Sequence, residues 1–192
     1  MTIHARRYSC VPSPRDGDSL SGYVARFGST HWLSRPVALR ALGWAYSDTD
    51  PGPNLDILTP DADVLESLTG RTGLDQQIFK DMVIQRFHPH VIDMTQLRIA
   101  TDTHGRSAGF NSTWRSLGWI YAGPTPVCAL CVIERPGAHR IEWRFGILPG
   151  CVRHEVTLVS HCPDCDRQPF DPRIWQKDAH SHNPDPWKCR CG

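Results

Sequence analysis

Paired cysteines in the last third of the chain constrain this sequence more than any other feature. Seven of the eight cysteines of the 192-residue chain lie between residues 128 and 191. Together with one histidine they form four close pairs, which are Cys128 with Cys131, Cys151 with His154, Cys162 with Cys165, and Cys189 with Cys191. Thiolates and imidazoles are ligands of tetrahedral zinc, and a tight turn between two ligands lets both bind one ion. The spacing therefore predicts two structural zinc ions.

Sequential pairing is the simplest assignment of the eight ligands to two ions. The first two pairs are then separated by 19 residues, and the last two pairs by 23 residues. An interleaved, cross-brace arrangement stays open, because a sequence gives the ligands but not their connectivity. A single ion and buried thiols without metal are further alternatives. Three other histidines are alternative sources of the imidazole, namely His161, His180 and His182.

Other sequence properties predict a cytoplasmic protein. No run of about 18 apolar residues is present, which is the length that a membrane-spanning helix requires. The first ten residues, MTIHARRYSC, are charged but are not followed by the apolar core of a signal peptide. In a reducing compartment, closely paired cysteines are expected to bind metal rather than to form disulfides.

Charge is balanced along the whole chain, whose formal net charge is +1. Residues 1–127 contain 12 Lys and Arg against 12 Asp and Glu, and residues 128–192 contain 9 against 8. Neither part has the basic excess of a protein that binds nucleic acid mainly through phosphates. Any contact with nucleic acid is therefore expected to use a local patch or to be shared with a partner.

Two short amphipathic helices are predicted near the N-terminus. Residues 18–28 carry apolar side chains at the i, i+3, i+4 and i+7 positions and are expected to end at Gly28. Residues 34–43 follow, with a proline in the first turn and Gly43 as the stop. The residues expected to cap the two helix starts are Asp18 or Ser19, and Ser34.

A second pair of helices is predicted after a connector rich in Pro and Asp, residues 47–60. Residues 61–70 show an apolar face and are expected to end at Gly70. Residues 72–83 form the next expected helix, with Thr72 as its cap. Two amphipathic helices joined by a short turn resemble a helix-turn-helix, and they also occur in ordinary small bundles.

These patterns together predict a mostly α fold with small zinc-ribbon or zinc-knuckle β elements. Three regions are expected. A helical, helix-turn-helix-like domain spans residues 1–90, a linker or irregular segment spans residues 91–127, and a tandem zinc-finger domain spans residues 128–192. One strand is expected within the linker, around residues 97–100.

No catalytic residues are predicted, and the chain is expected not to be an enzyme. Catalytic zinc usually has three protein ligands and an open position for water, whereas each predicted set here has four. The sequence contains no HExxH or GxxxxGK[ST] motif. Cys10 stands alone near the N-terminus, without a positioned base, and is expected to be inert.

Six arginines are the candidate contacts to nucleic acid. Three belong to the first predicted helix pair and three surround the first predicted zinc set. A recognition helix presents basic side chains on its open face, where they can reach phosphates or bases. The six candidates are Arg26, Arg35, Arg40, Arg140, Arg144 and Arg153.

Three stretches of the sequence form a combination that resembles one known family. The first is Pro14 followed by Asp-Ser-Leu-Ser-Gly-Tyr at 18–23 and by Arg26. The second is Leu-Thr-Gly at 68–70 before a helix. The third includes the first three ligand pairs, Trp143-Arg144, Leu158 and Pro163, and a closing Cys-x-Cys-Gly at 189–192. Over about residues 12–192 the chain resembles TniQ proteins, transposition factors that include the TnsD type. Asp18 stands where the family pattern has Glu.

The resemblance implies an adaptor rather than a catalyst. TniQ proteins join a helix-turn-helix part to a zinc-finger part and help to recruit an AAA+ transposition ATPase, similar to TnsC or TniB, to target DNA. This chain resembles a short member, and short members occur in CRISPR-associated transposons, where TniQ bridges an effector with its guide RNA to the ATPase. The alternatives are a stand-alone, sequence-specific DNA-binding regulator with zinc fingers and a helix-turn-helix, and a zinc hydrolase.

Overall fold

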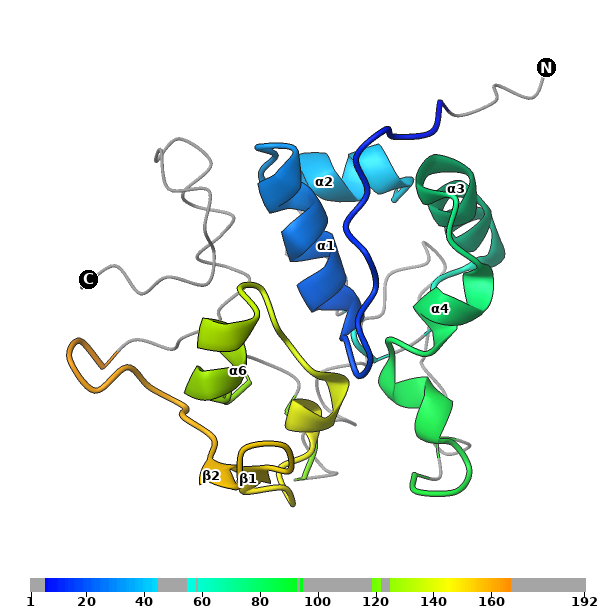
Figure 1. Cartoon of the computed structure of the whole chain (residues 1–192). Coiled ribbons are helices and arrows are strands. Elements are labelled where there is room, and N and C mark those ends of the chain that lie inside the picture. Colours follow the sequence, from blue (N-terminus) through cyan, green and yellow to red (C-terminus); the bar gives the residue numbers. More distant parts are fainter. Residues whose placement is uncertain are drawn as a thin grey trace.

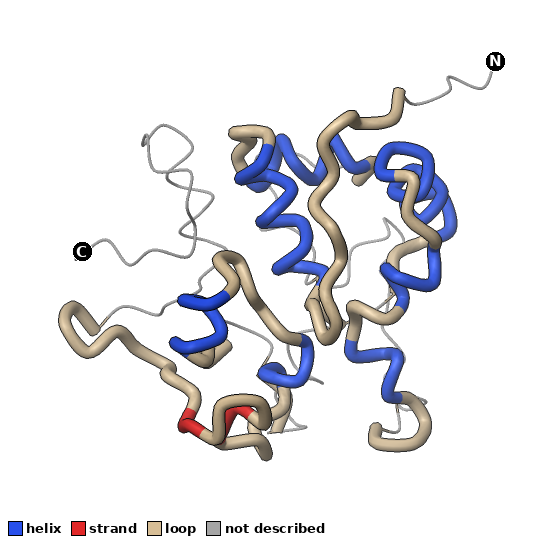
Figure 2. Tube along the Cα trace, viewed as in Figure 1, coloured by secondary structure: helices blue, strands red, loops and turns tan. Residues whose placement is uncertain are grey.

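The part of the chain that the structure describes is mostly helical and includes one small antiparallel sheet (Figures 1 and 2). The computed structural model describes residues 6–44, 55–57, 59–92, 94, 119–121 and 125–166. In chain order the elements are α1 (Leu20–Thr30), α2 (Arg35–Leu42), α3 (Ala62–Thr72), α4 (Gln76–Lys80), the 3-10 helix η1 (Ile84–Phe87), α6 (Ala129–Glu134), the 3-10 helix η2 (Ile141–Arg144), β1 (Gly150–Cys151) and β2 (Val156–Thr157).

Helix α1 begins where the sequence predicts but ends later. The Ser19 hydroxyl accepts a hydrogen bond from the Gly22 amide and caps the helix. The predicted end at Gly28 is wrong, because the helix continues to Thr30. The backbone N–H of His31 bonds to the Phe27 and Gly28 carbonyls, and the His31 ring lies 4.6 Å from that of Phe27. These contacts hold the last turn of α1.

Among the other predicted helices, the main difference from the structure lies where α3 ends and α4 begins. Helix α2 starts after Ser34 and stops at Gly43, as predicted. Gly43 has a left-handed backbone with a φ of 111°. Helix α3 passes through Gly70 to Thr72, so the predicted end at Gly70 is wrong. The cap of α4 is Asp75, whose carboxylate accepts from the Gln77 amide, and the predicted cap at Thr72 is therefore wrong as well.

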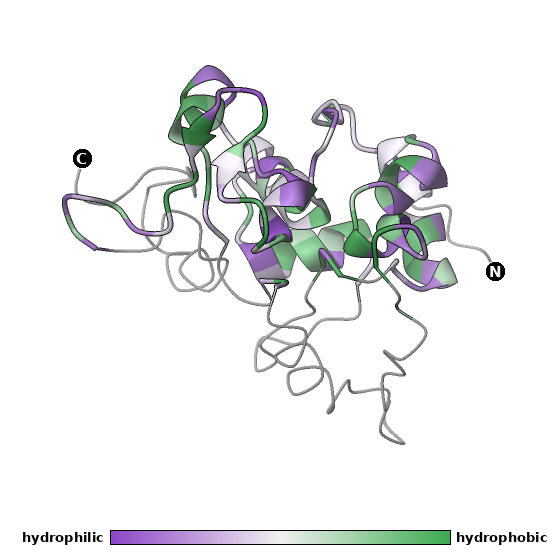
Figure 3. Cartoon of the chain, turned by 90° about the horizontal axis from the view of Figure 1, so that it is seen from below, coloured by the Kyte–Doolittle hydropathy of each residue, from purple (hydrophilic) through white to green (hydrophobic). Residues whose placement is uncertain are grey.

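Among the described residues, three hydrophobic clusters form the core, and two of them join early and late parts of the chain. The first cluster unites α1, α2, α3 and α4. The second packs Ala25 of α1 against residues from 127 to 158, and the third brings Ile84 against Ile141. Hydrophobic and hydrophilic residues alternate along the helices (Figure 3), as expected when each helix buries one face.

Trp143 is buried in the second cluster, at 2% exposure. The strand predicted around residues 97–100 lies outside the described residues, as does most of the predicted linker. The domain boundaries at 90 and 127 stay a prediction. Within the described ranges, no helix combines the length and the apolar character that crossing a membrane requires.

Candidate metal centre

Two short turns bring the first predicted ligand set together. Cys128 caps α6, and its sulfur accepts the backbone N–H of Cys131 at 3.4 Å. The second turn leaves β1 at Cys151 and passes through His154 before it returns as β2. Strands β1 and β2 pair through Cys151 and Val156, so the small sheet fixes the ends of this turn.

The four ligand atoms have the separations expected around one tetrahedral zinc ion. Their mutual distances are all within 4.8 Å. Nδ1 of His154 lies 3.4 Å from the Cys128 sulfur, 3.3 Å from that of Cys131 and 3.6 Å from that of Cys151. The sulfurs of Cys131 and Cys151 are 3.6 Å apart. Zn–S bonds of about 2.3 Å and a Zn–N bond of about 2.0 Å place tetrahedral neighbours about 3.5 to 3.8 Å apart.

Burial and composition make this a closed site. The three cysteines are buried and form no disulfide, and His154 is half-buried. Three thiolates and one imidazole fill a tetrahedral shell, which is the pattern of structural rather than catalytic zinc. The Cys128, Cys131, Cys151 and His154 cluster could therefore hold a metal ion and join the two turns.

Without a cation, the crowded thiols of this cluster have unequal acidity. Burial, together with the neighbouring cysteines, raises the pKa of Cys131 to about 12. Burial also acts to raise the pKa of Cys151, but the backbone N–H groups of His154 and Arg153 stabilise its thiolate, and the pKa falls to about 7. A bound divalent cation favours the thiolate form of coordinating cysteines.

Only half of the second predicted ligand set lies in the described part of the chain. Cys162 and Cys165 form a turn closed by the bond from the Asp166 N–H to the Cys162 carbonyl, at 2.9 Å. Both cysteines are half-buried. Cys189 and Cys191 lie outside the described residues, as do His180 and His182. The second zinc ion therefore stays a prediction.

A buried polar network ties α1 to the segment between α6 and η2. His139 is fully buried between two hydroxyls, with Nδ1 2.6 Å from Ser19 Oγ and Nε2 2.5 Å from Thr125 Oγ1. A neutral imidazole offers one donor and one acceptor, which matches two hydroxyl partners. Burial lowers the pKa of His139 to about 3, so the ring is neutral at physiological pH. Gly22 permits this approach, because a Cβ there would lie 2.8 Å from the His139 Cβ.

A buried ion pair makes a second link between the early and late parts of the chain. Asp56 is fully buried and accepts from Arg144 at 2.6 and 2.9 Å and from the Ser21 amide at 2.6 Å. Arg144 also donates to the Tyr121 carbonyl at 3.0 Å. Burial acts to raise the pKa of Asp56, but the guanidinium of Arg144, with His139 and the Ser21 amide, holds it below its usual range.

The six candidate arginines differ in where the structure places them. Arg26 forms a buried ion pair with Asp18 at 2.6 Å, and Arg144 binds Asp56. Arg35 is also buried, with a relative exposure of 5%. The expectation that these three lie on an open surface is therefore wrong, because desolvated guanidinium groups need carboxylate or carbonyl partners inside the protein.

The other three candidates lie nearer to solvent. Arg40 is exposed, Arg140 pairs with Glu142, and Arg153 pairs with Glu134 at 3.0 Å. Contact with nucleic acid stays a prediction for these residues. The sequence did not indicate the glutamate partners of Arg140 and Arg153 as functional residues. It also did not indicate Asp56 or His139.

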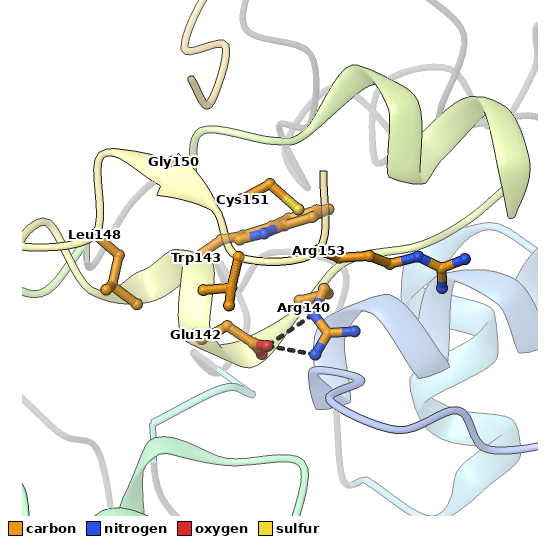
Figure 4. A pocket seen from close by; sticks show the side chains of 8 residues that line it. Arg140, Glu142, Trp143, Leu148, Gly150, Cys151 and Arg153 are labelled. Atoms are coloured by element: carbon orange, nitrogen blue, oxygen red, sulfur yellow. Dashed lines mark hydrogen bonds and ion pairs between the residues drawn. The ribbon is translucent and has the colours of Figure 1, made fainter. Parts of the chain in front are cut away.

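A hollow of about 350 Å³ lies beside the metal centre (Figure 4). Trp143, Leu148 and Val152 contribute its apolar walls, and Arg140 and Arg153 its basic ones. Cys151 also lines the hollow, next to the Trp143 ring. Glu142, which pairs with Arg140, is the acidic residue of this lining.

Comparison with known proteins identifies one family. The TniQ family model matches residues 9–158, which include α1 to β2 and all four ligands of the candidate metal centre. A search of curated proteins finds no match to the chain. The matched region contains the buried Asp18–Arg26 pair and the capping Ser19, so the residues that carry the sequence resemblance also hold the fold together. The chain belongs to the TniQ family, whose members are in general non-catalytic adaptors in transposition.

Proposed function

We propose that this protein recruits an AAA+ transposition ATPase, of the kind represented by TnsC and TniB, to target DNA. Family membership supports a transposition-associated adaptor role over residues 9–158. The proposal adds the identity of the partner, which is the ATPase. It also holds that the tandem zinc fingers bind two structural zinc ions and that α1 and α2 act as a helix-turn-helix. The protein would work in the cytoplasm, and its domains would be divided at residues 90 and 127.

One observation supports a protein partner in particular. Nine large hydrophobic side chains are exposed in the described residues, and five of them lie in α6 and around β1 and β2. We call this set the knuckle face, and it consists of Leu130, Ile133, Ile147, Val152 and Val156. Ile133 is 73% exposed, Ile147 63% and Val152 81%. Contiguous exposed apolar patches typically mark sites of protein–protein contact, and the proposal takes these five side chains to form such a patch.

The cations near the knuckle face already have acidic partners. Arg153 binds Glu134 at 3.0 Å, and Arg140 binds Glu142. A DNA phosphate at this face would meet these carboxylates and would have to compete with them. An apolar protein surface can instead cover Ile133 and Val152 and leave both ion pairs intact. The zinc module therefore fits an ATPase surface better than a phosphate backbone.

A role in RNA-guided transposition is a finer part of the proposal. In that setting the protein bridges the ATPase to a CRISPR effector with its guide RNA. The nearly balanced charge of the chain supports a bridge between partners rather than an autonomous DNA reader. Arg40, which is exposed on α2, is the contact to nucleic acid that belongs to this part of the proposal.

Co-sedimentation tests the proposal directly. The zinc-loaded protein is mixed with the ATPase of its own transposon, duplex DNA and ATP, and pelleted with the assembled ATPase. The protein is expected in the pellet only when the ATPase is present. If it fails to associate in every nucleotide state, the proposal is wrong. Tight and steeply salt-dependent binding of this chain alone to one DNA sequence would instead support a stand-alone regulator.

A further inference from the structure

Glu134 lies between the two turns that carry the candidate metal ligands. Its Oε1 is 3.1 Å from Nε2 of His154, and its Oε2 is 3.0 Å from the guanidinium of Arg153. Glu134 is the last residue of α6, the helix that also carries Cys131 and is capped by Cys128. One short helix therefore supplies two thiols and a carboxylate that reaches the imidazole of the opposite turn.

The two nitrogens of His154 face different partners. Nδ1 lies 3.3 to 3.6 Å from the three cysteine sulfurs, whereas Nε2 lies against Glu134. A carboxylate that accepts from Nε2–H fixes the tautomer and leaves the lone pair of Nδ1 for the metal. It also holds the plane of the ring.

We propose that Glu134 is the positioning residue of this metal centre and that it directs His154 to bind zinc through Nδ1. Arg153 supports this role, because it binds the second oxygen of the carboxylate from within the same turn as His154. Its positive charge also offsets the carboxylate beside a centre that already holds three thiolates. The proposal concerns the metal centre alone and does not depend on the ATPase or on DNA.

Zinc affinity of variants tests the role of Glu134. Affinities are measured by competition with a chromophoric chelator, and a Cys128→Ser variant gives the background from ions held elsewhere in the chain. Glu134→Ala is expected to weaken zinc binding about 10- to 100-fold, as loss of such partners does at other zinc sites. Glu134→Gln is expected to lose less, because its amide oxygen can still accept from Nε2–H.

Two further variants separate this role from a general effect of removing charge. Glu142→Ala removes another glutamate of the same region, one whose ion pair is with Arg140, and it should retain wild-type affinity. Arg153→Ala keeps the Glu134–His154 contact and should have only a small effect. Zinc affinity of Glu134→Ala equal to that of wild type would overturn the proposal.

Nitrogen NMR of the imidazole gives a readout that a merely structural role would not change. In zinc-loaded wild-type protein, ¹⁵N correlations of His154 should show metal at Nδ1 and a proton at Nε2. In Glu134→Ala, the Nε2–H signal should lose the shift that a carboxylate acceptor causes. If Glu134→Ala does not fold, the wild-type spectrum still tests the proposal, because it shows which nitrogen of His154 binds zinc. Coordination through Nε2 would contradict the proposal.

Discussion

Ser19 Oγ lies 2.6 Å from Nδ1 of His139, across 120 residues of sequence. The same hydroxyl accepts from the Gly22 amide and caps α1, so one oxygen both starts the helix and binds the segment that leads to η2. The backbone makes a parallel link, because the Ser19 N–H donates to the His139 carbonyl at 2.8 Å. The start of α1 is thus joined directly to the part of the chain that carries the metal centre.

Ser19→Ala should destabilise the protein by about 2 to 4 kcal/mol. Loss of the cap costs about 1 kcal/mol, and a buried imidazole nitrogen left without a partner costs about 1 to 3 kcal/mol more. Urea denaturation of the zinc-loaded protein measures the change. Ser34→Ala is the matched control, because Ser34 stands at the start of α2 but makes no side-chain cap bond. Equal effects of the two substitutions would contradict this account.

Asp56→Ala should cost about 3 to 5 kcal/mol, because it leaves the guanidinium of Arg144 buried without its carboxylate. Glu142→Gln breaks the more exposed pair with Arg140 and should cost about 1 kcal/mol or less. Thermal or urea unfolding of both variants gives the comparison. If Asp56→Ala were as stable as Glu142→Gln, the buried pair would not have the structural role described here.

Acid should destabilise the fold through His139. Its folded-state pKa of about 3 lies below the ordinary value of 6.5, so the unfolded chain binds the proton more readily. Stability is therefore full above about pH 6.5 and falls as the pH is lowered towards 3, by up to about 1.4 kcal/mol per pH unit. The measurement is the free energy of unfolding against pH for wild type and His139→Gln.

Acid also releases zinc and protonates carboxylates, but these effects occur in both proteins. The difference between the two pH profiles therefore isolates His139. A glutamine can bond to Ser19 and Thr125 without taking up a proton in this range, so its profile should be flatter between pH 6.5 and 3. Parallel profiles would show that His139 is already protonated, or already exposed, in the folded state.

Substitutions in the knuckle face should weaken recruitment without unfolding the protein. Ile133→Asp together with Val152→Asp places two charges where the proposed ATPase surface packs. Co-sedimentation with the ATPase should fall at least about 10-fold, since burying an unpaired charge costs several kcal/mol. Val91→Asp is the control, because Val91 is also exposed, at 59%, and lies in the turn after η1.

Two results would count against the knuckle face as the contact. The first is recruitment of the double variant at the wild-type level. The second is a loss of stability well beyond that of Val91→Asp, which would show that these side chains are covered by the protein itself. Failure of the wild-type protein to bind the ATPase is a separate outcome, and it would reject the proposed function as a whole.

Local patterns account for most of what the sequence predicted correctly. The first ligand set was identifiable because each pair of ligands lies within one turn and needs only a short spacing. The starts of α1 and α2 were identifiable because a serine directly precedes each apolar repeat, although only Ser19 makes a side-chain cap bond. The predicted ends at Gly28 and Gly70 failed because contacts elsewhere, such as that of His31 with Phe27, carry a helix past a permissive glycine.

The buried polar links were beyond the reach of sequence patterns. Asp56 and Arg144 are 88 residues apart, and neither position carries a periodic signal. An arginine on an amphipathic helix such as α1 is expected at the surface, and only the folded structure shows that Arg26 turns inward to Asp18. Arg144 is buried by a carboxylate that is far away in the sequence. Glu134 was missed for a related reason, because a glutamate after a CxxC pair has many ordinary surface roles.

The most direct test of the central claim is the zinc content of purified, chelator-washed protein, measured by elemental analysis together with that of Cys128→Ser. The account predicts two equivalents of zinc in wild type and one in the variant, because Cys128, Cys131, Cys151 and His154 hold one ion as a closed structural centre. Wild-type protein that is fully folded without zinc, or a Cys128→Ser variant that keeps the wild-type zinc content, would contradict it.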